Sequence, residues 1–236
     1  MADSHSLAVV IGSGGGLGAA LLTQLESDAS YTQAVGLSRS TEVSVDYLDE
    51  SSIAEAAESI ATLCATSGRE LRLLVVATGF LHGDAGQPER SFTQLDAAYL
   101  SHVFQVNTLG PALVMKHFLP LLPKTGRCVA GFISAKVGSI GDNALGGWYG
   151  YRASKAALNQ LVKTASIELS RRNKDSMCVC LHPGTVATAL SEPFAKTGLN
   201  VRPASEAAAD VLAVLAGLNP ADTGCLIDDQ GQKLPF

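Results

Sequence analysis

A glycine-rich loop stands between the first apolar run of the sequence and the helical pattern that follows it. The run Leu7–Ile11 is apolar at every position, which is typical of a strand buried on both faces of a sheet. Glycine then occupies five of the seven positions from 12 to 18, and Leu17, Leu21 and Leu25 have helical spacing. Glycines at a strand–helix junction allow a tight turn and let phosphate groups approach the helix N-terminus. The loop therefore predicts a nucleotide-binding α/β fold, with a flexible turn that binds nothing as the alternative.

Short apolar runs alternate with longer amphipathic stretches along the rest of the chain. The strands expected after the first are Gln33–Leu37, Val43–Val45, Leu73–Ala77, Cys128–Ile133, Cys178–Leu181 and Cys225–Ile227. The helices expected after the glycine loop are Ser51–Thr66, Leu95–Leu119, Tyr151–Arg171 and Ser205–Leu218. This alternation favours right-handed crossovers and a doubly wound parallel sheet of about seven strands. Because we find no linker and no internal repeat, we expect residues 1–236 to form a single-domain Rossmann fold.

Composition limits the classes of partner. Hydrophobic residues make up 47% and charged residues 17% of the chain, which is enough apolar material for one sizeable core. The formal net charge is −5 and no run of Lys or Arg interrupts the sequence, so we expect no nucleic-acid partner. The five cysteines are scattered without metal-ligand spacing, and no apolar stretch has the length of a membrane span. The expectation is a soluble cytoplasmic protein without a metal site.

Tyr151 and Lys155 open the helix expected over Tyr151–Arg171 and stand one turn apart on the same face. An ordinary tyrosine has a pKa of about 10, and a nearby ammonium group favours its ionised form. Such a tyrosine can donate a proton to a developing alkoxide, or accept one in the reverse direction. The pair therefore predicts proton-transfer chemistry, whereas a surface tyrosine with an incidental lysine is the alternative for the pair taken alone.

The two motifs together resemble the short-chain dehydrogenase/reductase family along the whole chain. Gly12, Gly16 and Gly18 match the Gly-x-x-x-Gly-x-Gly form of the loop in that family, and Tyr151 and Lys155 match its Tyr-x-x-x-Lys motif. The similarity is greatest to the carbonyl-reductase-like members related to the C-factor and sniffer proteins. The segments that carry this closer match are Ser134–Gly141, Gly146–Tyr149, Leu181–Val186 and Gly231–Phe236.

The resemblance implies a role for each matching residue. Tyr151 would be the general acid/base, Lys155 would bind the nicotinamide ribose and lower the pKa of Tyr151, and Asn107 would hold a water in a proton relay. The other positions that would contact the dinucleotide are Gly12, Ser13, Gly14, Gly16, Leu17, Gly18, Gly79, Pro183, Gly184, Val186 and Thr188. The alternatives are a solvated helix residue for Asn107 and a plain turn for Pro183 and Gly184.

One position departs from the family pattern. The family uses a serine, three residues before a glycine, to bind the substrate carbonyl, and alignment on Gly138 places Ala135 there. Ser134 stands one residue earlier and would face the other side of a continuing strand, so it substitutes only where the strand has ended or bulged. We expect Ser134 to take this role, with Ser139 or no serine at all as the alternatives.

The sequence after the second expected strand bears on the choice of dinucleotide. NAD-preferring Rossmann enzymes carry a carboxylate at the end of this strand, but here Leu37 runs into Ser38, Arg39 and Ser40. An arginine forms charge-assisted hydrogen bonds with a 2′-phosphate, so NADP(H) is favoured over NAD(H). A solvated loop arginine is the alternative reading of Arg39. The resemblance also assigns Asp46 to the adenine side of the site.

These features predict an NADP-dependent reductase or dehydrogenase that acts on a small carbonyl or alcohol compound. A dinucleotide-binding regulatory protein without turnover is the alternative, and Ala135 favours it. We expect the segment between Ala187 and Ser205 to cover the substrate, and Trp148 and Tyr149 to lie at the mouth of the site. The family often pairs subunits through its long helices, so a homodimer or homotetramer is also expected.

Overall fold

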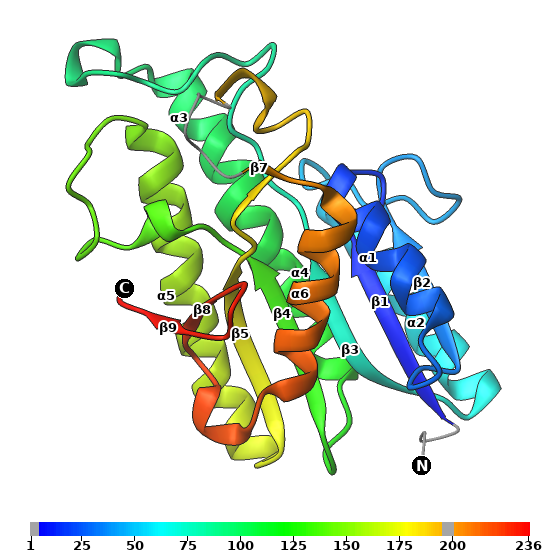
Figure 1. Ribbon diagram of the computed structural model, residues 1–236. Helices are drawn as coiled ribbons and strands as arrows, with labels where there is room; N and C mark the ends of the chain where they lie inside the picture. The colour runs from blue at the N-terminus through cyan, green and yellow to red at the C-terminus, as the bar shows by residue number, and fades with distance from the viewer. Residues whose placement is uncertain (1–4, 195–200) are drawn as a thin grey trace.

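The central sheet runs through the whole molecule (Figure 1), and the computed structural model describes residues 5–194 and 201–236. Its strands are β1 (Ser6–Ile11), β2 (Gln33–Leu37), β3 (Glu70–Val76), β4 (Cys128–Ile133), β5 (Ser176–His182), β8 (Leu226–Asp228) and β9 (Lys233–Leu234). They are ordered β2-β1-β3-β4-β5-β8-β9; β9 is antiparallel to β8, and the other neighbouring pairs are parallel. The strand order changes direction between β1 and β3, and ligands of such sheets bind beyond the carboxyl ends of the strands at this point. The predicted doubly wound fold is confirmed.

Helices cover both faces of the sheet. The α-helices are α1 (Gly16–Ser27), α2 (Glu50–Ser67), α3 (Ala97–Phe104), α4 (Gly110–Phe118), α5 (Tyr149–Arg172) and α6 (Ala204–Gly217). The short helices are η1 (Phe92–Gln94), η2 (Gln105–Leu109), η3 (Leu119–Leu121), η4 (Lys136–Gly138), η5 (Glu192–Phe194) and η6 (Pro220–Asp222). A separate two-stranded sheet joins β6 (Thr185–Val186) to β7 (Val201–Arg202). No helix in these two described stretches is long and apolar enough to cross a membrane.

Two apolar cores form because side chains of a strand alternate between its faces. On one face, Val9 and Phe132 pack in a cluster that contains residues of α2, α4 and α5. On the other face, Val10 and Val179 pack in a cluster with residues of α1 and α6, and these two helices lie together in front of the sheet in Figure 1. The strands are buried on both faces, as their continuous apolar sequences require. The sheet is therefore a rigid support for the loops at its carboxyl edge.

The strand expected over Val43–Val45 is absent, so that prediction was wrong. Only a single bridge between Ser38 and Ser44 extends the sheet beyond β2. The hydroxyl of Thr41 accepts from the backbone N–H of Ser38, and it lies 2.8 Å from the carbonyl oxygens of both Ser38 and Val43. These side-chain bonds hold the segment as a turn in place of a strand ladder.

The helix expected over Leu95–Leu119 is divided into α3, η2 and α4. The middle part, η2, is a π-helix in which the N–H of Gly110 donates to the carbonyl of Gln105. Pro111 follows at the start of α4 and has no N–H to donate to the carbonyl of Asn107, four residues earlier. Tyr47 lies so close to Gly110 that a Cβ there would be 2.0 Å from the ring atom Cδ2. The helix is therefore interrupted only over η2, and the predicted site residue Asn107 lies within this interruption.

Candidate active site

A cleft of about 570 Å³ opens beyond the carboxyl ends of the central strands. One end is lined by Gly15, Gly16, Leu17 and Arg39, which follow β1 and β2. The other end is formed by residues that follow β4 and β5 and by the start of α5, among them Tyr151 and Lys155. The further residues that border it are Ala77, Thr78, Gly79, Leu81, Ile133, Ser134, Ala135, Val137, Trp148, His182, Pro183, Gly184, Thr185, Val186, Thr188, Ala189, Leu190 and Ser191. The structure thus brings the two predicted motifs into one cavity.

The glycine loop fits closely against the elements around it. Gly12 has a φ of +91°, and a Cβ at Gly18 would be 2.1 Å from the Gly12 carbonyl oxygen, so both positions require glycine. A Cβ at Gly16 would be 2.9 Å from Cγ2 of Thr188 on the opposite side of the cleft. The N-terminus of α1 has Gly15 as its cap, with no side-chain cap and no acidic residue in the first turn. Its N–H groups therefore fit a pyrophosphate anion, which is what a dinucleotide would present.

Not every residue of the loop faces the cleft. Ser13 is buried, its N–H donates to the carbonyl of Leu37, and a Cβ at Gly36 would lie 2.8 Å from its hydroxyl. Ser13 therefore fastens the loop to β2, and contact between its side chain and a dinucleotide stays a prediction. Gly14 lies beside the hydroxyls of Ser38 and Ser40, which would be 3.4 Å and 3.7 Å from a Cβ there.

Arg39 forms the rim of the cleft after β2 and stands between Ser38 and Ser40 in the sequence. Arg39 is exposed, lines the cleft, and forms no ion pair within the described part of the chain. The hydroxyls of Ser38 and Ser40 lie 3.1 Å apart beside it. One guanidinium and two hydroxyls suit a phosphate group, and sequence reasoning named only the arginine. A predicted adenine contact, Asp46, lies beyond this rim: its carboxylate accepts from the N–H of Leu48, and it does not line the cleft.

Tyr151 and Lys155 are both nearly buried, with 8% and 2% of their surface exposed. The ammonium of Lys155 donates to the carbonyl of Ile133 at 2.9 Å and lies 5.8 Å from the ring centre of Tyr151. Burial lowers the pKa of Lys155 to about 8, with a small opposing contribution from Cys180. A lysine with this pKa exchanges its proton near neutral pH, as a proton relay requires.

The pKa of Tyr151 differs from the sequence prediction. Burial raises it above its ordinary value, and the neighbouring Tyr99 adds to the increase. The resemblance implies that the Lys155 ammonium lowers this pKa, whereas in the structure desolvation of the phenolate is the largest influence on it. Tyr151 is therefore a neutral phenol over the physiological range.

Asn107 is fully buried and does not itself line the cleft. Its amide group donates to the carbonyl of Phe80 at 2.8 Å and accepts from the N–H of Phe80 at 2.7 Å. The same amide donates to the hydroxyl of Ser154, one residue from Lys155. A Cβ at Gly79 would be 3.7 Å from both Oδ1 of Asn107 and Nζ of Lys155. Asn107 is thus a structural link between the loop after β3, the π-helix and α5, beside the lysine.

Comparison with known proteins agrees with this geometry. The family model described as short chain dehydrogenase matches residues 6–198. The chain belongs to the short-chain dehydrogenase family. It is 36% identical to the C-signal of Myxococcus xanthus over 142 residues, which cover 60% of this chain and 81% of that protein. The resemblance inferred from the motifs is confirmed.

Solved structures of the family share the fold. The NADPH-bound carbonyl reductase from chicken fatty liver has a TM-score of 0.83 at 24% identity, and the alignment covers 98% of this chain and 99% of that one. The carbonyl reductase Sniffer of D. melanogaster has the same TM-score at 23% identity, with coverage of 98% and 99%. The match to the family model makes the protein an oxidoreductase of the short-chain dehydrogenase type, and these solved structures show that it shares the fold of the carbonyl reductases.

The serine of this family is the position at which the chain departs from the pattern. Ala135 borders the cleft where the family has its serine. Ser134 is 3% exposed, and its hydroxyl donates to Oδ1 of Asn159 on α5 at 2.7 Å. Ser139 is also buried, and its hydroxyl accepts from the N–H of Asp142. Both candidate hydroxyls are therefore engaged in hydrogen bonds within the protein.

The loop after β5 closes the far side of the cleft. Pro183, Gly184, Val186 and Thr188 all border the cavity, and their contact with the nicotinamide end of a dinucleotide stays a prediction. The expected cover continues into residues 195–200, which lie outside the described residues. Trp148 lines the cleft, whereas the neighbouring Tyr149 does not. His182 also lines it, although sequence reasoning did not name it. His182 ends β5, which pairs with β4, and the predicted serine Ser134 follows β4. This position at the carboxyl end of a central strand is the signal that could have indicated His182.

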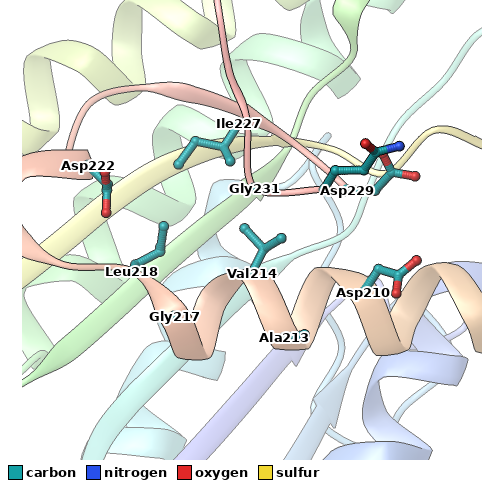
Figure 2. A pocket seen from close by; sticks show the side chains of 10 residues that line it. Asp210, Ala213, Val214, Gly217, Leu218, Asp222, Ile227, Asp229 and Gly231 are labelled. Atoms are coloured by element: carbon teal, nitrogen blue, oxygen red, sulfur yellow. The ribbon is translucent and has the colours of Figure 1, made fainter.

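A second cavity of about 360 Å³ lies between α6 and the segment after β8 (Figure 2). Three of the side chains around it are the carboxylates of Asp210, Asp222 and Asp229. Arg202 forms ion pairs with Asp210 and Asp229, and Lys233 forms one with Asp222. These carboxylates are already paired with cations of the chain, so we do not assign a ligand to this cavity. The ion pairs instead join β7, α6 and the C-terminal strands.

Proposed function

We propose that this protein is an NADP(H)-dependent reductase of small carbonyl compounds, with Tyr151 as the general acid. The observation that carries the proposal is the shared cleft: the uncapped N-terminus of α1 lies in the same cavity as Tyr151 and Lys155. An anion site for a dinucleotide and a buried proton donor are the two parts that carbonyl reduction needs. The reverse reaction, oxidation of an alcohol, uses the same residues.

The roles of the residues follow from their surroundings. The bound dinucleotide would supply a hydride to the carbonyl carbon. Tyr151, a neutral buried phenol, would donate its proton to the carbonyl oxygen as negative charge develops there. Lys155, with its pKa of about 8, would return a proton to the tyrosine. Asn107 would hold the water of that relay, and its carbonyl has no α-helical donor because Pro111 lacks an N–H.

The preference for NADP(H) rests on the rim after β2. Arg39 lines the cleft there and supplies one positive charge, the hydroxyls of Ser38 and Ser40 flank it in the sequence, and no carboxylate stands there to bind a 2′-hydroxyl. The chicken structure of the same fold is described as NADPH-bound, which supports this choice. The phosphate contacts assigned to the glycine loop, and the adenine contact assigned to Asp46, belong to the same proposal.

The hydrogen bonds of Ser134 change the role that we propose for it. To reach a substrate oxygen, its hydroxyl would have to give up the bond with Asn159. We therefore propose that Ser134 chiefly holds Asn159 and α5 in place. Tyr151 would then be the main hydrogen-bond donor to the substrate, because Ala135 supplies no hydroxyl.

The test is a spectrophotometric screen of NADPH and NADH oxidation against ketones, aldehydes and quinones, with Tyr151→Phe as the control. We expect turnover with NADPH and a loss of about a thousandfold in kcat/KM in the phenylalanine variant, which removes the acid and keeps the ring. Arg39→Ala should raise KM for NADPH at least tenfold and leave that for NADH unchanged. Tight NADPH binding without turnover of any compound would favour the regulatory alternative.

Assembly and location are separate proposals. We propose a homodimer or homotetramer, which sedimentation equilibrium of the purified chain would test. A cytoplasmic location is tested by fractionation of the cells that express the protein.

A further inference from the structure

Glu89 is a buried carboxyl group that the proposed mechanism does not use. It lies in the loop between β3 and η1, and only 2% of its surface is exposed. Both of its carboxylate oxygens lie 3.2 Å from the backbone nitrogen of Gly150, from which they accept a hydrogen bond. Its backbone carbonyl accepts from the N–H of Trp148. An acidic side chain is seldom buried without such partners, because desolvation of its charge is costly.

The contact is made at the start of the helix that carries Tyr151 and Lys155. Trp148 precedes the first turn of α5 in a left-handed conformation, with a φ of 53°, and makes no side-chain cap. The free N–H groups of the first turn require an acceptor, and a negative charge is favourable beside them. Glu89 supplies that acceptor from a position 61 residues earlier in the chain. The cap of α5 is therefore provided by the loop after β3, and not by the segment that leads into the helix.

Gly150 makes this approach feasible. A Cβ at this position would lie 3.1 Å from Oε1 of Glu89 and 2.9 Å from Cδ2 of Leu100. Any larger residue would therefore push the carboxylate away from the backbone nitrogen. The next residue is Tyr151, so the hydrogen bond fixes the backbone immediately before the proposed proton donor.

The same loop is also joined to the wall of the cleft. The hydroxyl of Tyr99 donates to the carbonyl of Leu81, which borders the cavity, at 2.8 Å. Burial, and secondly the charge of Glu89, raise the pKa of Tyr99 to about 12, so that phenol keeps its proton. The ring of Trp148 meets the ring of Tyr151 edge to face, with 6.2 Å between their centres. The loop that carries Glu89 thus borders the cleft at Leu81, and the segment that Glu89 binds borders it at Trp148 and Tyr151.

We infer that Glu89 is a positioning residue, which caps α5 from the loop after β3 and so holds Tyr151 and Trp148 in place at the cleft. The inference rests on the proposed function only for its effect on turnover. Its effect on the position of Trp148 is independent of any reaction.

Trp148 makes a direct test possible, because it is the only tryptophan of the chain. The variants are Glu89→Ala and Glu89→Gln, and the matched control is Asn173→Ala at the opposite end of α5. Asn173 is similarly buried, and its amide donates to the carbonyls of Pro123 and Gly126. Removing it also breaks a link between α5 and a loop, but far from the cleft.

We expect Glu89→Ala to shift the emission maximum of Trp148 and to lower kcat about tenfold, with KM for NADPH unchanged. Glu89→Gln keeps an acceptor oxygen at the same length and should recover most of both properties. Asn173→Ala should lower the melting temperature and leave emission and kcat as in the parent protein. If the alanine variant fails to fold, Glu89→Asp replaces it, since aspartate keeps the charge but loses the reach to Gly150, and the same shift is expected.

An unchanged emission maximum in a folded Glu89→Ala or Glu89→Asp variant would overturn the inference. So would an equal shift in Asn173→Ala, because the effect would then be one of general stability. If the parent protein reduces no carbonyl compound, the proposed function fails, and the emission of Trp148 still decides the role of Glu89.

Discussion

Lys155 illustrates how burial shifts the pKa of a single residue. Its pKa is lowered from 10.5 to about 8 because the ammonium group is desolvated. The charged form therefore predominates below pH 8 and is lost as the pH rises through this value. We expect kcat/KM for reduction to fall above about pH 8, and Lys155→Arg to lower kcat/KM over the whole pH range, because arginine stays protonated and cannot pass a proton to Tyr151. The measurement is the pH profile of kcat/KM, and a profile that is flat from pH 7 to 10 would contradict it.

Ala135 and Ser134 allow a paired prediction at the same scale. A hydroxyl at position 135 would face the cleft, so Ala135→Ser should raise kcat/KM about tenfold through a second donor to the carbonyl oxygen. Ser134→Ala leaves Oδ1 of Asn159 without its donor and should destabilise the protein by about 1–2 kcal/mol, with kcat nearly unchanged. Denaturant unfolding and initial rates measure the two effects. A hundredfold loss of kcat in a stable Ser134→Ala variant would instead restore Ser134 to the chemistry.

At the scale of elements, the contact between the glycine loop and α1 determines whether a dinucleotide can be bound. Gly18→Ala would place a Cβ 2.1 Å from the carbonyl oxygen of Gly12, which is backbone and cannot move aside cheaply. We expect a lower melting temperature and at least a tenfold weaker Kd for NADPH, measured by fluorescence titration.

Gly217→Ala is the matched control for that substitution. Gly217 also lies in a helix, α6, but a Cβ there would have no atom within 4 Å. Alanine at that position should leave NADPH binding unchanged and should not reduce stability. A similar loss of binding in both variants would show that the close approach at Gly18 is not the cause.

The whole molecule is built around a sheet that is buried on both faces. The thiols of Cys178 and Cys180 on β5 are buried with it. Burial raises the pKa of Cys178 to about 12 and that of Cys180 well above its ordinary value. Because the folded protein disfavours the thiolate, the neutral Cys178 thiol contributes to stability at low pH. This contribution is complete below about pH 9, the pKa of an exposed thiol, and is lost as the pH rises towards 12. The free energy of unfolding should therefore fall between pH 7.5 and 10.5 by on the order of 2 kcal/mol for Cys178 alone.

Urea unfolding at the two pH values measures this effect, and Cys178→Ala is the comparison. The variant is expected to be less stable at pH 7.5 because it leaves a small cavity. Its stability should nevertheless decline less between pH 7.5 and 10.5 than that of the parent protein. An equal decline in both proteins would assign the alkaline sensitivity to other groups, among them Tyr47, whose pKa burial also raises.

The amino-acid sequence by itself was sufficient for features that depend on neighbours along the chain. The spacing of Gly12, Gly16 and Gly18, the one-turn separation of Tyr151 and Lys155, and the alternation of strands and helices are all local patterns. They predicted the fold and brought both motifs to the carboxyl edge of the sheet, because right-handed crossovers leave few other arrangements. The family followed from the same motifs.

Tertiary structure alone decided the features that depend on contacts between distant residues. The turn held by Thr41 replaced a strand, and the crowding of Tyr47 against Gly110 accompanies the π-helix. The hydrogen-bond partner of a buried hydroxyl likewise lies on another element, since Ser134 donates to Asn159. The bond between Glu89 and Gly150 is of the same kind, because a cap supplied from 61 residues away leaves no local pattern in the sequence.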